Sequence, residues 1–311
     1  MVATAPNASP PPHAGWWVST ADPAIDARRQ AVLARRTWYP PAGPDPVTVT
    51  RSALRTAGAA LVPLLADHGM VTIDVADGPL VPQELVDLAA VFGEPLPEDD
   101  PDVQPFVGSG AVLELATVVR APLPSLQPFS RGWLSLHTEG SRRPSARRPR
   151  FVLFCCLVPP FRDHGGQTLL HRTSRVLHAL SPRSETVLRG TVLGPGAGDT
   201  AIVSGHGPSA TITFRDPVPD AVPWTSAFEG PEVEAALGEL LAAVYDQRHV
   251  HGVHWRRHRL VVLDNARFLH GRSASDGGRR VLQRVRVRGL AGPGDDPSTP
   301  RRQDREEVAR G

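Results

Sequence analysis

The sequence contains no lysine, so all 34 of its basic side chains are arginines. The formal net charge is only +2, which does not indicate a general surface for nucleic acid. A coding bias against lysine explains the arginine usage without a functional role. The cluster "SRRPSARRPR" (141–150) is interpreted as a solvated loop, and we expect no nucleic-acid partner.

Long apolar runs and cysteines are also missing. No apolar run approaches the roughly 18 to 20 residues that a membrane helix requires. The start, "MVATAPNASPPPHAGWW", lacks the basic residues and the apolar core of a signal peptide, so we expect a cytoplasmic protein without a membrane partner. The two cysteines, Cys155 and Cys156, are adjacent in the apolar stretch "FVLFCCLVPP". This pattern predicts free buried thiols and excludes a structural zinc site.

The distribution of proline, glycine and apolar residues predicts one domain with two irregular ends. Residues 1–45 are proline-rich and lack periodicity, which predicts a flexible arm, and the polar residues 291–311 predict a disordered tail. Between them, residues 46–290 are expected to form a single domain. Three stretches predict helices, and many short apolar runs after residue 150 predict strands. The expected fold class is mainly β with flanking helices around a barrel or sandwich core.

The stretch "GWLSLHTEGSRR" (132–143) carries the first candidate site residues. His137 and Glu139 are one residue apart in an extended segment, so their side chains share a face. They could form part of a metal site, an acid–base pair or a surface ion pair. His270 follows a predicted buried strand and the turn "DN". Two histidines and a carboxylate on a β scaffold form the facial triad of non-haem Fe(II) oxygenases, which leaves three coordination positions open.

Several motifs occur in a fixed order around these residues: "HTE", "GGQT" (165–168), "RTSRVLHALSP", "LDNARFLHGR" and an arginine-rich strand, "VLQRVRVRG". On these motifs the sequence resembles the taurine dioxygenase superfamily of Fe(II)/2-oxoglutarate oxygenases, in particular its clavaminate synthase-like branch. The resemblance covers roughly residues 75 to 290. It implies a double-stranded β-helix (jelly-roll, cupin-like) core, with Fe(II) as the metal and 2-oxoglutarate and O2 as co-substrates.

The resemblance also implies a role for individual residues. His137, Glu139 and His270 would bind Fe(II), and Thr168 and Arg284 would hold 2-oxoglutarate. Arg288 would contact a carboxylate of the substrate. Asp216 and Asp220 lie in a stretch that resembles a lid, and they are candidate contacts for a cationic substrate group.

The chemistry of the arginine-rich strand supports the same assignment. Arg284 and Arg288 share one face of the predicted strand, where two guanidinium groups could each hold a carboxylate. A structural role is the alternative for two of these residues. Thr168 could be an ordinary strand residue, and Arg288 could form a structural ion pair. Arg280 and Arg286 are interpreted as members of surface or supporting ion pairs.

These observations predict an Fe(II)/2-oxoglutarate-dependent dioxygenase of specialised metabolism. Its expected substrate is a free amino acid or an amino-acid-derived small molecule, which it would hydroxylate, desaturate or cyclise. Glu139 argues against halogenation, since halogenases of this superfamily carry a small residue there. One alternative is an oxygenase for a carrier-tethered amino acid or another carboxylate. An alternative of another class is a metal-binding β-barrel without catalytic activity.

Overall fold

The computed structural model describes residues 13–19, 21–34, 37–116, 124–161, 165–194, 200–218, 220–275 and 279–289. The tail predicted at residues 291–311 lies outside these ranges, as do residues 1–12 of the predicted arm. Across the described ranges, no helix combines the length and the apolar character that crossing a membrane would require.

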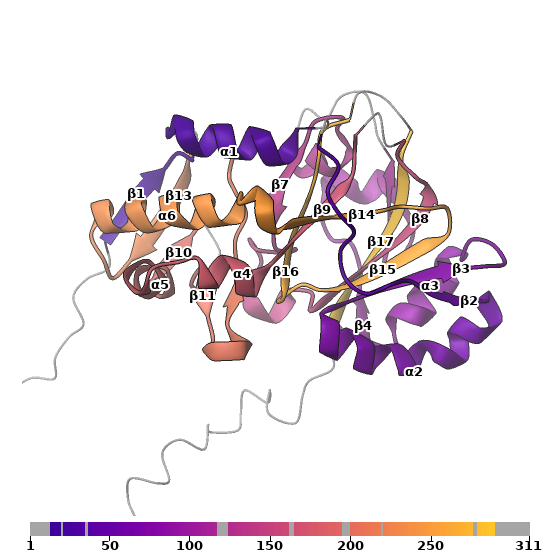
Figure 1. The fold of residues 1–311 in the computed structure, drawn as a ribbon. Coiled ribbons are helices and arrows are strands. Elements are labelled where there is room, and N and C mark those ends of the chain that lie inside the picture. The colour runs from indigo at the N-terminus through magenta and orange to yellow at the C-terminus, as the bar shows by residue number, and fades with distance from the viewer. Residues whose placement is uncertain are drawn as a thin grey trace, which may run out of the picture.

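A large sheet forms one wall of the core (Figure 1). Its strands, in spatial order, are β2 (Val47–Val49), β3 (Met70–Val75), β15 (Arg259–Asp264), β8 (Phe151–Val158), β17 (Val281–Gly289), β6 (Val112–Ala116) and β5 (Val107–Ser109), and β4 (Gly93–Leu96) also pairs with β17. Strand β15 is buried along its whole length, and its successive residues belong alternately to the two hydrophobic clusters on either side. Burial on both faces explains why these strands are continuous apolar runs in the sequence.

A smaller antiparallel sheet faces the large one. Its order is β14 (Val250–Val253), β9 (Thr168–Arg172), β16 (Phe268–Arg272) and β7 (Leu134–His137). The two sheets pack through one cluster, which includes Phe154 and Val261 of the large sheet and Leu170 and Phe268 of the small one. The candidate site lies between these sheets, because β7 and β16 carry the two predicted histidine ligands while β17 carries the arginines.

Helices cover the outer faces of both sheets (Figure 1). Helices α2 (Arg51–His68) and α3 (Pro82–Ala89) pack on the large sheet, and helices α1 (Pro23–Leu33), α4 (Thr173–His178), α5 (Pro182–Arg189) and α6 (Gly230–Val244) pack on the small one. Thr50 caps the start of α2, and Gly69 ends it at a φ of 72°, a left-handed conformation that glycine adopts without strain. The predicted helical stretches therefore form α2, α3 and α6.

The remaining elements are short. Strands β1 (His13–Trp17), β13 (Val222–Ser226) and β10 (Thr191–Leu193) form a small sheet, and β11 (Val203–Ser204) pairs with β12 (Thr211–Ile212). The 3-10 helices are η1 (Pro101–Phe106), η2 (Pro124–Phe129), η3 (Ser145–Arg147), η5 (Gly207–Ser209) and η6 (Gln247–His249). Most of them connect strands at the edges of the core.

Two sequence-based expectations differ from the observed fold. Residues 13–33 are not an arm, because β1 pairs with β13 and the helix α1 buries Ile25, Val32 and Leu33 in the cluster under the small sheet. The predicted lid at residues 214–230 contains β13, which is held between β1 and β10. Both stretches are rich in proline or glycine, which is typical of irregular structure. A short strand on a small sheet needs few consecutive apolar residues, so neither β1 nor β13 gave a clear strand pattern in the sequence.

Candidate active site

Three buried side chains converge between the two sheets. His137 ends β7, Glu139 follows two residues later, and His270 lies on β16 directly opposite His137. One ligand atom from each residue lies within 4.8 Å of the others. Glu139 Oε2 is 3.5 Å from His270 Nε2 and 4.0 Å from His137 Nε2. Two imidazole nitrogens and one carboxylate oxygen that face one point fit an Fe(II) site with open positions.

Backbone contacts fix the orientation of two of these ligands. The Nδ1 atom of His137 is 2.8 Å from the carbonyl oxygen of Ser135. A proton on Nδ1 that is donated to this carbonyl leaves the Nε2 lone pair free for a metal. The side chain of Asn265 accepts a hydrogen bond from Glu139 N at 2.7 Å and donates one to Glu139 O at 3.0 Å. Asn265 therefore fixes the backbone that presents the carboxylate.

The electrostatics hold His137 and Glu139 in their metal-binding protonation states. Burial, the neighbouring His270 and the Arg215 guanidinium together hold the pKa of His137 well below its usual range. The pKa of Glu139 also lies well below its usual range, although burial alone would raise it, because Arg284, His270 and Arg286 stabilise its anionic form. A neutral imidazole and an ionised carboxylate are the forms that coordinate a metal.

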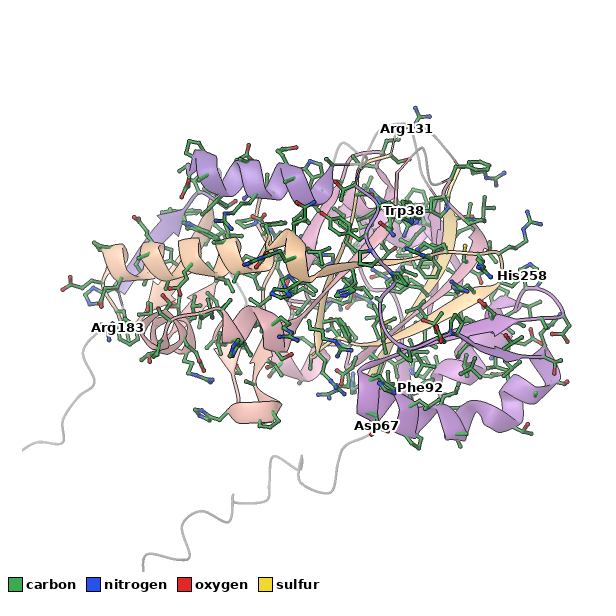
Figure 2. All side chains as sticks on the ribbon, in the orientation of Figure 1. Trp38, Asp67, Phe92, Arg131, Arg183 and His258 are labelled. Atoms are coloured by element: carbon green, nitrogen blue, oxygen red, sulfur yellow. The ribbon has the colours of Figure 1, made fainter. Side chains whose placement is uncertain are left out.

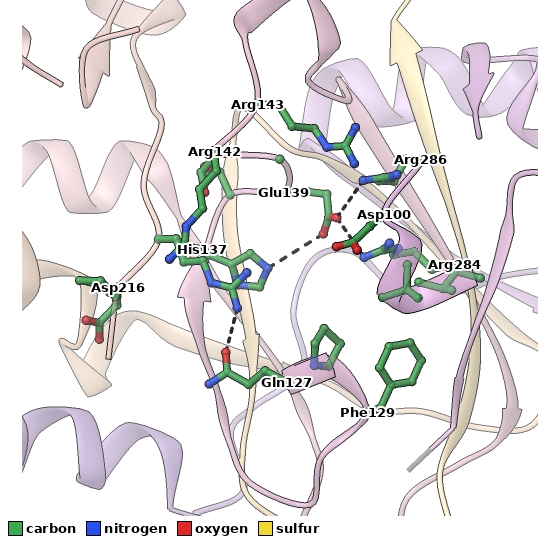
Figure 3. A pocket seen from close by; sticks show the side chains of 18 of the residues that line it. Asp100, Gln127, Phe129, His137, Glu139, Arg142, Arg143, Asp216, Arg284 and Arg286 are labelled. Atoms are coloured by element: carbon green, nitrogen blue, oxygen red, sulfur yellow. Dashed lines mark hydrogen bonds and ion pairs between the residues drawn. The ribbon is translucent and has the colours of Figure 1, made fainter. Parts of the chain in front are cut away.

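A compensated charge cluster lies behind Glu139. Arg284 donates from Nη1 to Glu139 Oε1 at 2.9 Å and from Nη2 to Glu98 Oε2 at 2.8 Å. Arg286 donates to the other oxygen of Glu98 at 2.8 Å. Figure 3 shows Arg284 and Arg286 on the same side of Glu139. Two arginines and two carboxylates balance one another, so both Nη groups of Arg284 are already engaged.

Arg280 is also buried, but its surroundings are different. Its Nη2 atom donates to Thr168 Oγ1 at 2.9 Å, and its Nε atom has no hydrogen-bond partner. No carboxylate of the described residues lies within ion-pair distance of it. Burial and the nearby Arg272 lower the pKa of Arg280 to about 9. Arg280 lines a small cavity of about 40 Å³ together with Thr168 and the three candidate ligands.

A larger cavity of about 540 Å³ opens on the other side of the triad. Such a volume suits a small organic ligand. His137, Glu139 and Arg284 line both cavities, so the candidate metal site lies where they meet. The wall of the larger cavity includes Phe129 (Figure 3) and Arg215.

Comparison with known proteins finds similar sequences and similar folds. Residues 198–286 match the model of the family described as "Taurine catabolism dioxygenase TauD, TfdA family". The chain is thus similar to this family over less than a third of its length. The matched segment includes the distal histidine, His270, and the arginines Arg280, Arg284 and Arg286, which surround the site described above.

One curated relative and several solved structures are similar to the chain. A 3-((Z)-2-isocyanoethenyl)-1H-indole synthase of Fischerella ambigua (strain UTEX 1903) is 24% identical over 178 residues, which are 51% of this chain and 64% of that protein. The chain thus spans less than two thirds of that relative's length. PvcB, an "Fe, alpha-ketoglutarate dependent oxygenase from an isonitrile synthetic pathway", gives a TM-score of 0.58 at 21% identity, with 78% of this chain and 83% of that chain covered.

A second enzyme structure, asparagine oxygenase in complex with Fe(II), 3-hydroxyasparagine and succinate, gives a TM-score of 0.55 at 17% identity. That match covers 86% of this chain and 92% of the other. The fold of the chain is therefore the fold of these oxygenases. The prediction of a mainly β, jelly-roll core with flanking helices is confirmed.

The structure brings most of the predicted site residues together and leaves others outside. Thr168 and Arg284 lie beside the triad, as described above. Arg288 is half exposed near the end of β17, where it pairs with Glu94 at 3.0 Å, and it lines neither cavity. Its predicted contact with the substrate does not fit this position, because the strand has left the core by that residue.

The two predicted aspartates also have different surroundings from those expected. Asp216 is buried and receives a bond from Arg29 Nε at 2.7 Å and another from the Tyr245 hydroxyl at 2.7 Å. It is thereby neutralised inside the protein, so a substrate cation would have to compete with Arg29. Asp220 is exposed and lines the rim of the larger cavity, where a contact with substrate stays a prediction.

Sequence reasoning missed Glu98, Arg215 and the burial of Arg280. Arg280 precedes Arg284 by four residues and so shares its strand face, which was an available signal. Glu98 lies in the acidic run "PEDDPD", which is typical of an exposed loop. Only the tertiary fold brings it beside Arg284 and Arg286.

Proposed function

We propose that this chain is an Fe(II)/2-oxoglutarate-dependent oxygenase that oxidises a C–H bond of an amino acid or an amino-acid-derived small molecule. The observation that carries the proposal is the buried triad of His137, Glu139 and His270 at the junction of two cavities. The larger cavity can hold an organic ligand beside the open metal positions, and the smaller one places Arg280 and Thr168 next to the triad. The TauD/TfdA-family match and the oxygenase fold support it.

Each ligand residue would hold the metal through one atom. The Nε2 atoms of His137 and His270 and the Oε2 atom of Glu139 face the same point. Arg284 occupies Glu139 Oε1, which favours coordination through the single remaining oxygen. When bound, iron and 2-oxoglutarate supply the oxidising chemistry, and the protein supplies position, charge and exclusion of water.

Arg280 and Thr168 are the best candidates for the distal carboxylate of 2-oxoglutarate. A buried guanidinium without a carboxylate partner is costly, and an incoming anion would remove that cost. Arg284 is a poorer candidate than the sequence predicted, since its two Nη groups already bind Glu139 and Glu98. In this assignment Arg284 orients the metal ligand and Arg280 binds the co-substrate.

The substrate class rests on the size of the cavity and on the similar proteins. One similar structure contains 3-hydroxyasparagine and another contains (3S)-hydroxy-L-Arg, both oxidised amino acids. Hydroxylation is the default outcome, and desaturation or ring formation are alternatives. A second candidate is an isonitrile-bearing acid derived from an amino acid, which the indole-isonitrile synthase and PvcB favour. A carrier-tethered amino acid is a further alternative, as is a non-catalytic metal-binding barrel.

A co-substrate turnover screen tests the proposal. The purified protein is incubated with Fe(II), 2-oxoglutarate and each of the twenty amino acids or a set of isonitrile acids, and succinate and oxidised product are measured. We expect succinate formation above that of the His270→Ala variant, with at least one acid that stimulates it. Succinate formation equal in the two proteins would refute the enzymatic proposal and favour the non-catalytic barrel. A cytoplasmic location and the lack of nucleic-acid and membrane partners stay predictions.

A further inference from the structure

Two arginines on the wall of the larger cavity have no carboxylate partner among the described residues. Arg215 is partly buried, and within the described ranges its side chain donates only from Nη2 to Gln127 Oε1, at 2.8 Å. Arg142 is exposed on the loop after Glu139 and forms no ion pair within the described ranges.

The other cavity arginines are compensated. Arg284 and Arg286 share Glu98 and Glu139, and Arg143 pairs with Asp99. Positive charge without a counter-ion is thus concentrated at Arg215 and Arg142 in this cavity. Burial and the charge of Arg142 lower the pKa of Arg215, although the Glu139 carboxylate acts in the opposite direction. An unpaired guanidinium inside a protein costs free energy unless an anion binds there.

The backbone places Arg215 beside the candidate metal site. Arg215 forms an antiparallel bridge with His137, so the two side chains leave the same face of the sheet extension. The Thr138 N–H donates to the Phe214 carbonyl at 2.9 Å, and the Phe214 N–H donates to Thr138 Oγ1 at 3.1 Å. These bonds hold the segment that presents Arg215 in a fixed register with the ligand strand.

The guanidinium also has donors left for a ligand. An arginine carries five N–H donors, and Gln127 accepts from only one of the two Nη groups of Arg215. Gln127 itself is held in place, because Arg272 donates to the carbonyl oxygens of Ser130 and Gly132 on the same loop at 2.6 and 2.8 Å. The guanidinium group of Arg215 is therefore held in place at the wall of the cavity, with N–H donors available for a ligand.

We propose that Arg215, assisted by Arg142, binds a carboxylate of the prime substrate on the His137 side of the candidate metal site. Arg280 lines only the smaller cavity and Arg215 only the larger one, and both cavities share His137 and Glu139. The substrate anion and the co-substrate anion would thus bind on separate sides of the metal. This inference rests on the proposed function and identifies the substrate as an acid, held by a different arginine from the predicted Arg288.

Inorganic sulfate tests the anion site without knowledge of the substrate. Its binding to the full-length protein is measured by isothermal titration calorimetry with 2-oxoglutarate present in all solutions. We expect Arg215→Gln to weaken sulfate binding by about tenfold or more, since a charge-assisted hydrogen bond contributes about 1.5 to 3 kcal/mol. Arg215→Lys, which keeps the charge, should retain most of the affinity. Arg288→Gln is the matched control outside the cavity and should bind like the unmodified protein.

A second variant separates direct binding from an effect on the loop. Gln127→Ala removes the hydrogen bond between Gln127 and Arg215 but keeps the Arg215 charge. We expect its sulfate affinity to lie within about threefold of that of the unmodified protein. Equal weakening in Gln127→Ala and Arg215→Gln would overturn the proposal, because Arg215 would then act only through the loop. Absence of sulfate binding, unchanged binding in Arg215→Gln, or equal weakening in Arg288→Gln would also overturn it. Failure of the oxygenase proposal would appear separately, as absence of succinate formation.

Discussion

Replacement of Arg280 by glutamine should separate co-substrate binding from folding. Arg280 is buried, donates to Thr168 and has no carboxylate partner among the described residues. Burial lowers its pKa from the usual 12.5 to about 9, so its charge costs the resting protein on the order of 4 to 5 kcal/mol. Loss of a buried charged contact typically costs 2 to 5 kcal/mol in binding, which is at least about thirtyfold in Kd. Arg280→Gln should therefore weaken 2-oxoglutarate binding by that factor without lowering the free energy of unfolding.

Arg284→Gln provides the contrast. It would leave Glu98 and Glu139 short of a buried partner, a loss that typically costs about 3 to 5 kcal/mol of stability. Calorimetric titration of 2-oxoglutarate into the metal-loaded protein without oxygen, together with urea unfolding, measures both effects. The assignment would be refuted if Arg280→Gln left the 2-oxoglutarate affinity unchanged while a fully stable Arg284→Gln protein lost most of it. Arg284 would then be the residue that binds 2-oxoglutarate.

Three further predictions concern the rest of the fold. Arg29→Gln should lower the free energy of unfolding by about 3 to 5 kcal/mol in urea unfolding, because its aspartate partner stays buried, whereas Arg248→Gln at an exposed pair should leave it nearly unchanged. Burial lowers the pKa of His171 from 6.5 to about 4, so the unfolded chain binds a proton first on acidification. The free energy of unfolding should then fall by up to about 3 kcal/mol as the pH is lowered from 6.5 to 4. The His171→Gln protein should lack this part of the fall, which would confirm that His171 causes it. Burial raises the pKa of Cys155 and Cys156 to about 12, so iodoacetamide should label both at pH 8 only after denaturation, and rapid labelling of the native protein would contradict their burial.

Local patterns in the sequence were sufficient to predict the core elements. The apolar runs "FVLFCCLV" and "RLVVLD" form β8 and β15, and the stretch that ends at Gly69 forms α2. The grouping of His137, Glu139 and His270 was also predictable from the motif order that the family resemblance supplied. His137 and His270 lie on β7 and β16, and Glu139 lies in the turn after β7. Local periodicity and a known motif order carry this information within short segments.

The charge arrangement around the triad could not be predicted in the same way. Whether an arginine is paired depends on carboxylates far away in the chain, such as Glu98, which lies 186 residues from Arg284. The sequence therefore gave no means to distinguish the compensated Arg284 from the uncompensated Arg280 and Arg215. The N-terminal strand β1 was missed for a related reason, since it is defined by its pairing with β13.

Anaerobic titration of Fe(II) and 2-oxoglutarate, followed by visible absorption, tests the central claim that His137, Glu139 and His270 form an iron site. We expect a weak charge-transfer band that saturates at one Fe(II) per chain. His137→Ala should abolish the band, and His251→Ala, an exposed histidine outside the site, should leave it unchanged. A band of undiminished intensity in His137→Ala, or no band in the unmodified protein, would contradict the assignment of the site.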